Sequence, residues 1–478
     1  MKRVAPLVCL TVGLFFADPG FLHAGDQERK KRPNIVIIWV DALRADHLSC
    51  YGYGRKTSPF IDTLADQGAL FENCISASSW TKTSGISFFT SQWVSIHGIE
   101  TPVQRFGEES ITFTEILQKN GYATAAFVQS PFFHPELGFK QGFDYYSYPI
   151  MEYDSLSEFR KIIHFPAKAI FPWVEAHVGE PFFIWVHLFY PHGTYTPPEP
   201  YNRRFVDDHY AVSGRQVPVG EDQLYAYKVI PGYQNLDGRT DIDYYVSQYD
   251  GEILFTDSKV KKIVDKLSDL GILDDTLIMI SADHGENLGE NEYYFVHTLL
   301  YDPVIRVPLI IRYPPAIPGG SRIPYQVRSV DLAPTIFDIL GIPLPDAMVG
   351  KSLMPFIRQE EKTDRTALSR GHSLKGGFAV DTDTEGARVT SIRVRIKHHM
   401  WKLIYHLDRV EASADELYDL TQDPQESTNV IKKSRGTFRF LEKLLLSMIR
   451  KEKAAASPKE EKFSPETKAL LRSLGYAQ

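Results

Sequence analysis

Cysteine is scarce in this chain. Of 478 residues only three are cysteine, and the first, Cys9, lies in an apolar N-terminal segment. Cys50 and Cys74 remain beyond that segment, and in an oxidising compartment they would be able to form one disulfide. Two buried free thiols are equally compatible with the sequence, so the pairing stays open at this point.

Long apolar runs are also absent. After the N-terminus, no segment approaches the roughly 18 uninterrupted apolar residues of a transmembrane helix. Met1-Lys2-Arg3 and the apolar residues 4–17 are typical of a secretory signal peptide, with Ala24-Gly25 as a cleavage point. We therefore expect residues 1–24 to be removed and the chain to be exported, to a periplasm or outside the cell, with no transmembrane anchor left. An uncleaved N-terminal anchor is the alternative.

A strong charge of either sign is lacking. The net charge is −7, and no long basic run is present. Neither nucleic acid nor an anionic membrane surface is therefore expected as a partner. No internal repeat is visible. The hydrophobic content of 43% and the aromatic content of 13% are sufficient for a large packed interior. The length predicts one large domain and a smaller one.

Strand and helix patterns alternate through most of the chain. This alternation predicts an α/β fold with a mainly parallel sheet sandwiched by helices. The expected strands are residues 35–40, 123–129, 181–187, 276–282 and 307–312. The expected helices are residues 58–67, 111–119, 241–270 and 329–340.

The pattern changes after residue 365. Residues 390–397 and 400–405 alternate like antiparallel strands, and a helix is expected over 437–453. We predict a main domain over 32–357, a C-terminal α+β subdomain over 366–453, and a linker with a short terminal helix over 454–478.

Two of the expected strands end in acidic residues. The apolar run 34–40 leads directly into Asp41, and the run 276–282 leads into Asp283-His284-Gly285-Glu286. An open α/β sheet binds its ligands at the carboxyl ends of its strands. A carboxylate and an imidazole at that edge are metal ligands, although an Asp closing a strand is often only a turn residue. Between these strands, Ser79–Ser91 is rich in small hydroxyl residues and would open a helix, whose first N–H groups favour an anion.

Together these segments resemble the sulfatase family within the alkaline phosphatase superfamily. The similarity covers nearly everything after the signal peptide. The motifs that carry it are Arg32-Pro-Asn-Ile-Val-Ile-Ile-Trp-Val-Asp-Ala-Leu-Arg-Ala-Asp-His-Leu48, Cys50-Tyr-Gly-Tyr53, Thr57-Ser-Pro-Phe-Ile-Asp62, Gly142-Phe-Asp144, Tyr249-Asp-Gly-Glu-Ile253, Asp274-Asp-Thr-Leu277, Ser281-Ala-Asp-His-Gly-Glu286, Leu300-Tyr-Asp302, Arg306-Val-Pro-Leu309, Asp331-Leu-Ala-Pro-Thr335, Glu416-Leu-Tyr-Asp-Leu420 and Asp423-Pro424. The resemblance implies an alkaline-phosphatase-like fold and an ester hydrolase.

By this resemblance Asp41, Asp283 and His284 would bind a divalent cation, and Thr81 would be the nucleophile and a further metal contact. Sulfatases carry a Cys or Ser there, within a Cys-x-Pro-Ser-Arg type motif, and oxidise it to formylglycine. The matching run here is Thr81-Lys82-Thr83-Ser84-Gly85. Oxidation of Thr would give a ketone, so the formylglycine hydrate is not accessible by the usual route. A metal-bound Thr alkoxide is nevertheless a competent nucleophile toward phosphorus, and superfamily relatives with Thr there act on phosphoryl groups.

Further basic residues follow from the same resemblance. His192 matches a histidine that contacts the anionic group or leaving group of the substrate. His297 lies where the family supplies a basic residue, and Lys82 is adjacent to the proposed nucleophile. His187 we interpret as a core histidine at a strand end rather than a ligand, and His134 is left outside the expected site because its neighbours do not match the family.

The family's opening strand usually ends in two acids, whereas Ala42 follows Asp41 here. The Asp-x-x-x-His pair of two-metal relatives is also missing, since Leu254 stands four positions after Asp250. We expect one divalent ion, with Ca, Mg, Mn and Zn all compatible.

Two functions follow from these observations. The first is an exported metal-dependent hydrolase or transferase acting on phosphate, phosphodiester or sulfate esters through Thr81. The alternative is a catalytically silent protein of the same fold that binds an anionic glycan or a partner. The substrate would be a small-molecule, glycan or lipid ester. Its identity and the oligomeric state are not specified by the sequence.

Overall fold

The computed structural model describes residues 32–101, 104–148, 164–206, 214–221, 226–372, 388–407 and 415–452. The part of the chain from Pro33 onward forms one compact unit. The predicted signal peptide, the linker and the terminal helix lie outside the described residues. Among the helices within them, none has both the length and the apolar character required to cross a bilayer.

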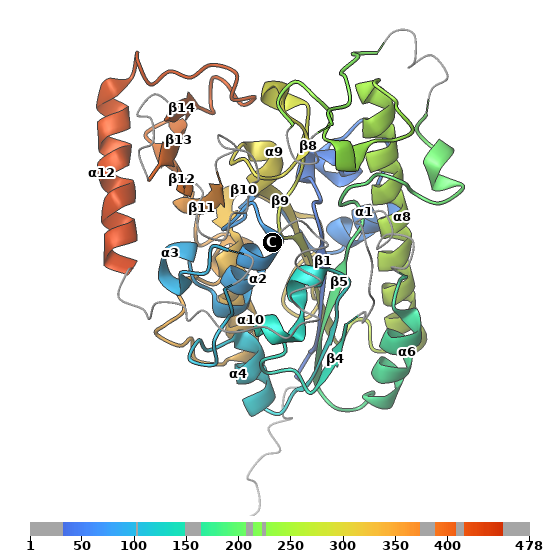
Figure 1. The fold of residues 1–478 in the computed structure, drawn as a ribbon. Coiled ribbons are helices and arrows are strands. Elements are labelled where there is room, and N and C mark those ends of the chain that lie inside the picture. The colour runs from blue at the N-terminus through green and yellow to red at the C-terminus, as the bar shows by residue number, and fades with distance from the viewer. Residues whose placement is uncertain are drawn as a thin grey trace, which may run out of the picture. The chain divides into compact units, whose positions relative to one another are not determined.

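An eight-stranded sheet lies at the centre, in the order β10-β2-β9-β6-β1-β5-β3-β4 (Figure 1). Its strands are β1 (Asn34–Val40), β2 (Ala69–Ile75), β3 (Ala123–Phe127), β4 (Tyr145–Ser147), β5 (Phe182–Leu188), β6 (Thr276–Ala282), β9 (Arg306–Arg312) and β10 (Ser321–Arg328). Strand β9 runs antiparallel to β2 and to β6, and the other pairs in this sheet are parallel. The predicted mainly parallel sheet is confirmed.

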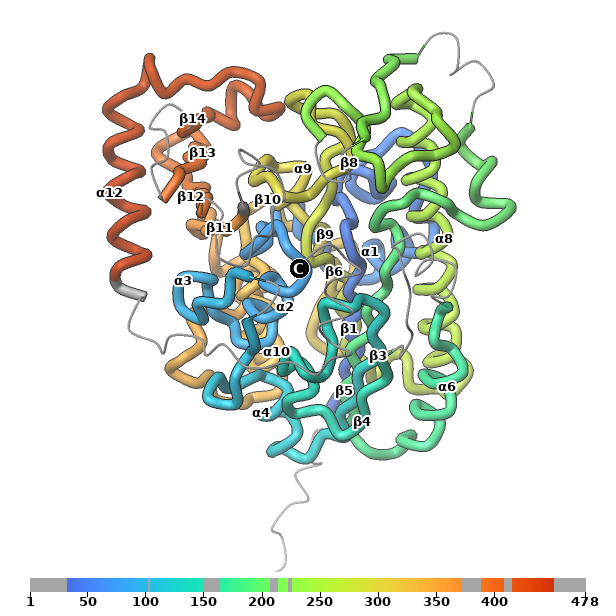
Figure 2. The backbone as a smooth tube through the Cα atoms, viewed as in Figure 1, coloured from blue at the N-terminus to red at the C-terminus, as the bar shows by residue number. Residues whose placement is uncertain are grey.

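Strand β1 lies between β5 and β6, as the tube trace shows (Figure 2). All three strands are buried along their full length, which explains their continuous apolar runs. In the register of the sheet, Val40 pairs with Leu188 on one side and with Ala282 on the other. The three strands therefore end together, and the residues that follow them meet at one edge of the sheet.

Helices cover both faces of this sheet (Figure 1). On one side lie α1 (Pro59–Asp66), α6 (Ala167–Ala176) and α8 (Ile242–Asp269), and on the other lie α2 (Thr81–Thr90), α4 (Phe113–Lys119) and α10 (Leu332–Leu340). Shorter helices are α3 (Val94–His97), α9 (Asp302–Ile305) and α11 (Met354–Ile357). Helix α4 begins with a capping box in which Thr112 and Glu115 each bond the other's backbone N–H, an arrangement that satisfies two donors of the first turn.

A second, antiparallel sheet follows in the order β11-β12-β13-β14. It comprises β11 (Ala367–His372), β12 (Arg388–Ile396), β13 (His399–His406) and β14 (Glu416–Asp419), and helix α12 (Arg435–Glu452) packs against it. Leu403 and Leu417 of this sheet share one apolar cluster with Leu441 and Leu445 of α12. The expected C-terminal sheet with its helix is confirmed. In the sequence, a two-stranded ribbon of β7 (Asn287–Leu288) and β8 (Tyr294–Val296) lies between the loop that follows β6 and helix α9.

The structure settles the question of the cysteines. Cys50 and Cys74 are both free thiols. Burial raises the pKa of each thiol above its usual value, so both stay protonated and unreactive near neutral pH. Of the two alternatives, the structure therefore has two free thiols and no Cys50–Cys74 disulfide.

Candidate active site

Two carboxylates meet at the ends of β1 and β6. Asp41 follows β1 and is 1% exposed, and Asp283 follows β6 and is fully buried. One oxygen of Asp283 accepts the N–H of Ala42 at 3.2 Å and that of His284 at 2.9 Å, which ties the two loops together. Its other oxygen, Oδ2, and both oxygens of Asp41 accept no hydrogen bond from the described residues. Buried carboxylate oxygens without a partner are costly unless a cation is close by.

Helix α2 delivers Thr81 to the same place. Thr81 is the first residue of the helix, as the sequence predicted, and its hydroxyl oxygen lies 3.1 Å from Nε2 of His284. The hydroxyl of Ser84, one turn further on, donates to the carbonyl of Asp283 at 2.8 Å, which fixes the start of the helix over the end of β6. The first N–H groups of a helix have no partner within the helix, so this end attracts an anion.

Three histidines of this region make the same kind of contact through Nδ1. Each Nδ1 lies beside a backbone carbonyl: His284 on Gly285 at 2.8 Å, His192 on Gly193 at 3.0 Å and His297 on Ser79 at 3.1 Å. A carbonyl only accepts, so in the neutral form Nδ1 carries the proton and Nε2 presents a lone pair. Nε2 of His284 is therefore the acceptor for the Thr81 hydroxyl, or a metal ligand.

The rings of these histidines form one group. His284 and His297 stack with centroids 4.1 Å apart, and the centroid of His192 lies 5.2 Å from that of His297 and 6.4 Å from that of His284. The structure thus brings together Thr81, Asp41, Asp283 and the three histidines named from the sequence. Their roles remain predictions.

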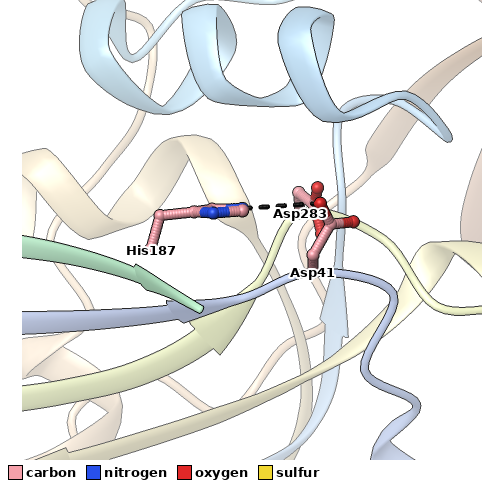
Figure 3. A group of neighbouring side chains, drawn as sticks. All are labelled: Asp41, His187 and Asp283. Atoms are coloured by element: carbon pink, nitrogen blue, oxygen red, sulfur yellow. Dashed lines mark ion pairs between the residues drawn. The ribbon is translucent and has the colours of Figure 1, made fainter. Parts of the chain in front are cut away.

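His187 belongs to this site as well, although the sequence analysis interpreted it as a core residue. Its Nε2 lies 3.5 Å from Oδ2 of Asp41, and ligand atoms of Asp41, His187 and Asp283 all lie within 4.8 Å of one another. Figure 3 shows the three side chains converging from β5, β1 and β6. A single histidine near the end of an apolar strand gives no spacing signal, so only the strand register reveals this neighbour.

Lys82 has a different environment. Its side chain is buried, and the ammonium group donates to the carbonyl of Thr101 at 3.3 Å and to that of Gln104. Burial lowers the pKa of Lys82 to about 7. These contacts hold the ammonium on the segment around residues 101–104, and a catalytic role for Lys82 remains a prediction.

Burial dominates the electrostatics of the site. It raises the pKa of Asp41 well above its usual value, the charge of Asp283 raises it further, and the nearby Thr81 hydroxyl lowers it only in part. Burial likewise raises the pKa of Asp283. Burial lowers the pKa of His187, His284 and His297 to about 3 each, so these imidazoles are neutral.

A divalent cation fits this arrangement. The donors are two carboxylates that have unpartnered buried oxygens and neutral imidazoles whose Nε2 atoms face them, with Nε2 of His284 3.6 Å from Asp41 and 3.5 Å from Asp283. Such separations are long for hydrogen bonds and suit ligands that share one ion, because bonds of about 2.0–2.2 Å separate neighbouring ligand atoms by roughly 3.0–3.5 Å. A cation would also remove the repulsion between the two carboxylates.

Glu286, two residues after His284, makes buried contacts with Tyr195 and Arg44. The hydroxyl of Tyr195 donates to Glu286 Oε2 at 3.0 Å, and both side chains are fully buried. The guanidinium of Arg44 donates to the carbonyl of Glu286 at 3.1 Å and also pairs with Asp46 and Glu290. These contacts brace the loop that carries His284.

Comparison with known proteins identifies the family. The family model described as "Sulfatase" matches residues 33–342, and one described as "N-sulphoglucosamine sulphohydrolase, C-terminal" matches residues 289–453. An N-acetylglucosamine-6-O-sulfatase of Bacteroides thetaiotaomicron is 25% identical, over 85% of this chain and 84% of that protein. A choline-sulfatase of Rhizobium meliloti is 24% identical, over 85% of this chain and 83% of that protein.

Solved structures share the fold. A protein in complex with its substrate, D-glucosamine-2-N,6-O-disulfate, has a TM-score of 0.70 and 23% identity over 90% of this chain and all of that one. A phosphonate monoester hydrolase of Agrobacterium radiobacter has a TM-score of 0.69 and 22% identity, over 88% of this chain and 96% of that one. With the first family model matching well over half of its length, the chain belongs to the sulfatase family of ester hydrolases.

Proposed function

We propose that this chain is an exported, metal-dependent hydrolase or transferase that acts on phosphate or phosphodiester groups, or on sulfate esters, through Thr81. The observation that carries the proposal is the position of the Thr81 hydroxyl, at the first residue of α2 and 3.1 Å from Nε2 of His284. Export rests on the signal-peptide pattern of residues 1–24.

The residues divide into three roles. Asp41, Asp283, His284 and the Thr81 oxygen would hold one divalent ion. When bound, the ion lowers the pKa of the hydroxyl and offsets the charge of the transferring group. The free N–H groups in the first turn of α2, which begins at Thr81, would stabilise the same anionic group. His192 and His297, whose rings lie next to that of His284, would contact the anionic group or the leaving group of the substrate.

The reaction would proceed in two steps. The Thr81 hydroxyl passes its proton to water, its oxygen forms a bond to phosphorus or sulfur, and the bond from that atom to the leaving oxygen breaks. His192, in the imidazolium form, would supply a proton to the leaving oxygen, while His297 stays neutral. Water, or an acceptor alcohol in a transfer reaction, then attacks the phosphorus or sulfur atom held on Thr81. The bond from that atom to the Thr81 oxygen breaks, and the proton of the attacking hydroxyl restores the Thr81 hydroxyl.

Phosphoryl chemistry is the favoured branch. Thr81 has a methyl group on its Cβ and oxidises only to a ketone, so it lacks the aldehyde hydrate with which sulfatases expel sulfate. Two observations bear on the alternative of a silent binding protein. The ligand-bearing residues converge at the strand ends, and the buried oxygens of Asp41 have no partner among the described residues; both favour a retained metal and retained chemistry.

The test compares three esters: p-nitrophenyl sulfate, p-nitrophenyl phosphate and bis-p-nitrophenyl phosphate, each with added Ca, Mg, Mn or Zn. Wild type and Thr81→Ala are assayed in parallel. Metal-dependent cleavage of a phosphoester that is lost in Thr81→Ala is the expected result. Turnover of the sulfate alone would contradict the preference for phosphorus. No turnover of any ester, together with no bound metal, would favour the binding protein.

A further inference from the structure

We propose that His187 is a ligand of the metal ion, so that this site has two imidazole ligands and prefers a borderline transition metal such as Zn to Ca or Mg. The proposal concerns only ligation and metal choice. It rests on the metal site of the proposed function and is independent of whether Thr81 is the nucleophile.

The ring of His187 has no hydrogen-bond partner among the described residues. His187 is fully buried, and neither of its ring nitrogens makes a hydrogen bond within the described residues. A buried polar group without a partner costs on the order of 1–3 kcal/mol. By contrast, the buried His97 has a hydrogen-bond partner, because its Nε2 lies 2.9 Å from the hydroxyl of Ser87.

The ring of His187 is directed toward the carboxylate of Asp41. Nε2 of His187 faces Oδ2 of Asp41 at 3.5 Å, too far for a good hydrogen bond and suited to two ligands of one ion. The His187 ring packs edge-on against Phe133, with ring centroids 4.8 Å apart. Nε2 of His187 is thus directed at the carboxylates, and Nδ1 has no hydrogen-bond partner among the described residues.

The pairing of β5 with β1 also places His187 close to Asp41. Ala42, which follows Asp41, has no ligand atom in its side chain. On the other side of β1, β5 places His187 one residue before Leu188, whose carbonyl accepts the N–H of Asp41 at 2.9 Å. The backbone bond therefore fixes the distance between Asp41 and the end of β5. An ion on the carboxylates would meet His187 without any rearrangement of the chain.

The chemistry of the donor set determines the metal class. With His284 and His187, two imidazoles join two carboxylates and a hydroxyl. Ca, Mg and Mn are suited to oxygen ligands, whereas imidazole suits Zn, Cu, Fe and Ni. Removal of one imidazole would weaken Zn strongly and leave Ca nearly unaffected, and exchange of the imidazole for a carboxylate would shift the preference toward Ca.

The test measures metal binding rather than activity. Full-length wild type, His187→Phe and His187→Asp are stripped with chelator, and the affinities for Zn, Mn and Ca are measured by competition with a chromophoric chelator. Metal content after dialysis is measured by mass spectrometry. His177→Phe is the control, because His177 follows α6 and stacks on Trp173 with ring centroids 3.8 Å apart; the phenyl ring keeps this stacking and loses only the hydrogen bond to the Trp173 carbonyl.

The expected result is one Zn per wild-type chain, a Zn affinity lower by at least on the order of 100-fold in His187→Phe, and a gain of Ca relative to Zn in His187→Asp. The control keeps the wild-type affinity. In chelator, His187→Phe should unfold at a temperature at least as high as wild type, because an unpartnered imidazole has been replaced by an apolar ring. That result shows that any loss of metal is not a loss of fold.

Wild-type Zn affinity in a folded His187→Phe variant would overturn the proposal while leaving the proposed function intact. A wild-type chain that binds Ca more tightly than Zn would overturn the metal preference. Lost metal in His187→Phe with no Thr81-dependent turnover in wild type would support the ligand and contradict the proposed function, so the two failures are distinguishable.

Discussion

The hydroxyl oxygen of Thr81 lies 3.1 Å from Nε2 of His284, and the other ring nitrogen of His284 lies 2.8 Å from the carbonyl of Gly285. The carbonyl requires the proton on Nδ1, so Nε2 is left as a lone pair directed at Thr81. The backbone of the Asp283–Glu286 loop therefore sets the chemical form of the imidazole next to the proposed nucleophile. Thr81 and His284 are 203 positions apart in the sequence.

A hydroxyl at position 81 should be sufficient for activity. Thr81→Ser keeps the oxygen, and we expect it to retain turnover within about tenfold of wild type. Thr81→Val keeps the shape and removes the oxygen, and we expect kcat to fall by roughly 10⁴-fold or more, as for loss of other catalytic nucleophiles. Steady-state kinetics on the preferred p-nitrophenyl ester measures both. Thr90→Val, at the far end of the same helix, is the control, because its hydroxyl bonds only Ile86 among the described residues. Equal losses in the Ser and Val variants would argue against a nucleophilic oxygen.

Gly285 should not tolerate a side chain. A Cβ there would lie 2.1 Å from the carbonyl oxygen of Pro303, so the loop that carries His284 would have to shift. We expect Gly285→Ala to lower the free energy of unfolding by about 1–3 kcal/mol. We also expect its kcat to be lower than that of wild type under conditions in which both proteins are fully folded. Gly54→Ala, where no atom lies within 4 Å, should behave as wild type. Urea unfolding and kinetics on both variants test this, and a fully active Gly285→Ala protein would contradict it.

Glu286 should make the metal-free protein less stable at alkaline pH. Burial raises its pKa to about 8 from 4.5. Between these values the folded state keeps a proton that the unfolded state releases, so the free energy of unfolding falls as pH rises, by up to about 1.4 kcal/mol per pH unit. Glu286→Gln should remove this contribution, so that its slope in chelator from pH 5 to pH 8 is smaller than the wild-type slope, to which Asp41 and Asp283 also contribute.

The control for this measurement is Glu290→Gln. Burial raises the pKa of Glu290, but the ion pair with Arg44 outweighs this effect and leaves that pKa below its usual value. That substitution should change stability by an amount independent of pH above about pH 5, because both states are then ionised. A slope in Glu286→Gln equal to the wild-type slope would show that Glu286 is not the titrating group.

Lys402 should hold the second sheet to the main part of the protein. Its fully buried ammonium lies 2.9 Å from Asp302 and 2.7 Å from Glu426. Lys402→Met leaves two buried carboxylates without this cation, and we expect a loss of about 3–5 kcal/mol in the free energy of unfolding. Lys261→Met removes an exposed pair with Asp265 (2.6 Å) and should stay within about 0.5 kcal/mol of wild type. Similar losses for both variants in denaturant titrations would contradict the assignment.

Much of the fold could be predicted from periodicity, because the central strands are buried on both faces. Strands β1, β5 and β6 read as continuous apolar runs, and α8 as a long amphipathic helix. Strands β2 and β10 were not predicted. In β2 the apolar run is interrupted by Glu72 and Asn73, and β10 is an edge strand that contains Pro324. Such strands form because their neighbours in the sheet offer pairing partners, which no local pattern indicates.

The site was predictable to the extent that it follows strand ends and motifs. Asp41 and Asp283-His284 stand directly after apolar strands, and Thr81 was placed by its resemblance to the family. His187 was not found, because its importance depends on the register between β1 and β5 rather than on any spacing along the chain. The direction of the Lys82 side chain was likewise not predictable, since it depends on the distant carbonyls of Thr101 and Gln104.

The most direct test of the central claim is a search for the covalent intermediate. The metal-loaded protein is mixed with bis-p-nitrophenyl phosphate, quenched in acid during turnover, digested and sequenced by tandem mass spectrometry. The account predicts a peptide heavier by the transferred phosphoryl group, with the modification on the oxygen of Thr81 and absent from Thr81→Val. Sustained turnover with an unmodified Thr81, or turnover that persists in Thr81→Val, would contradict it.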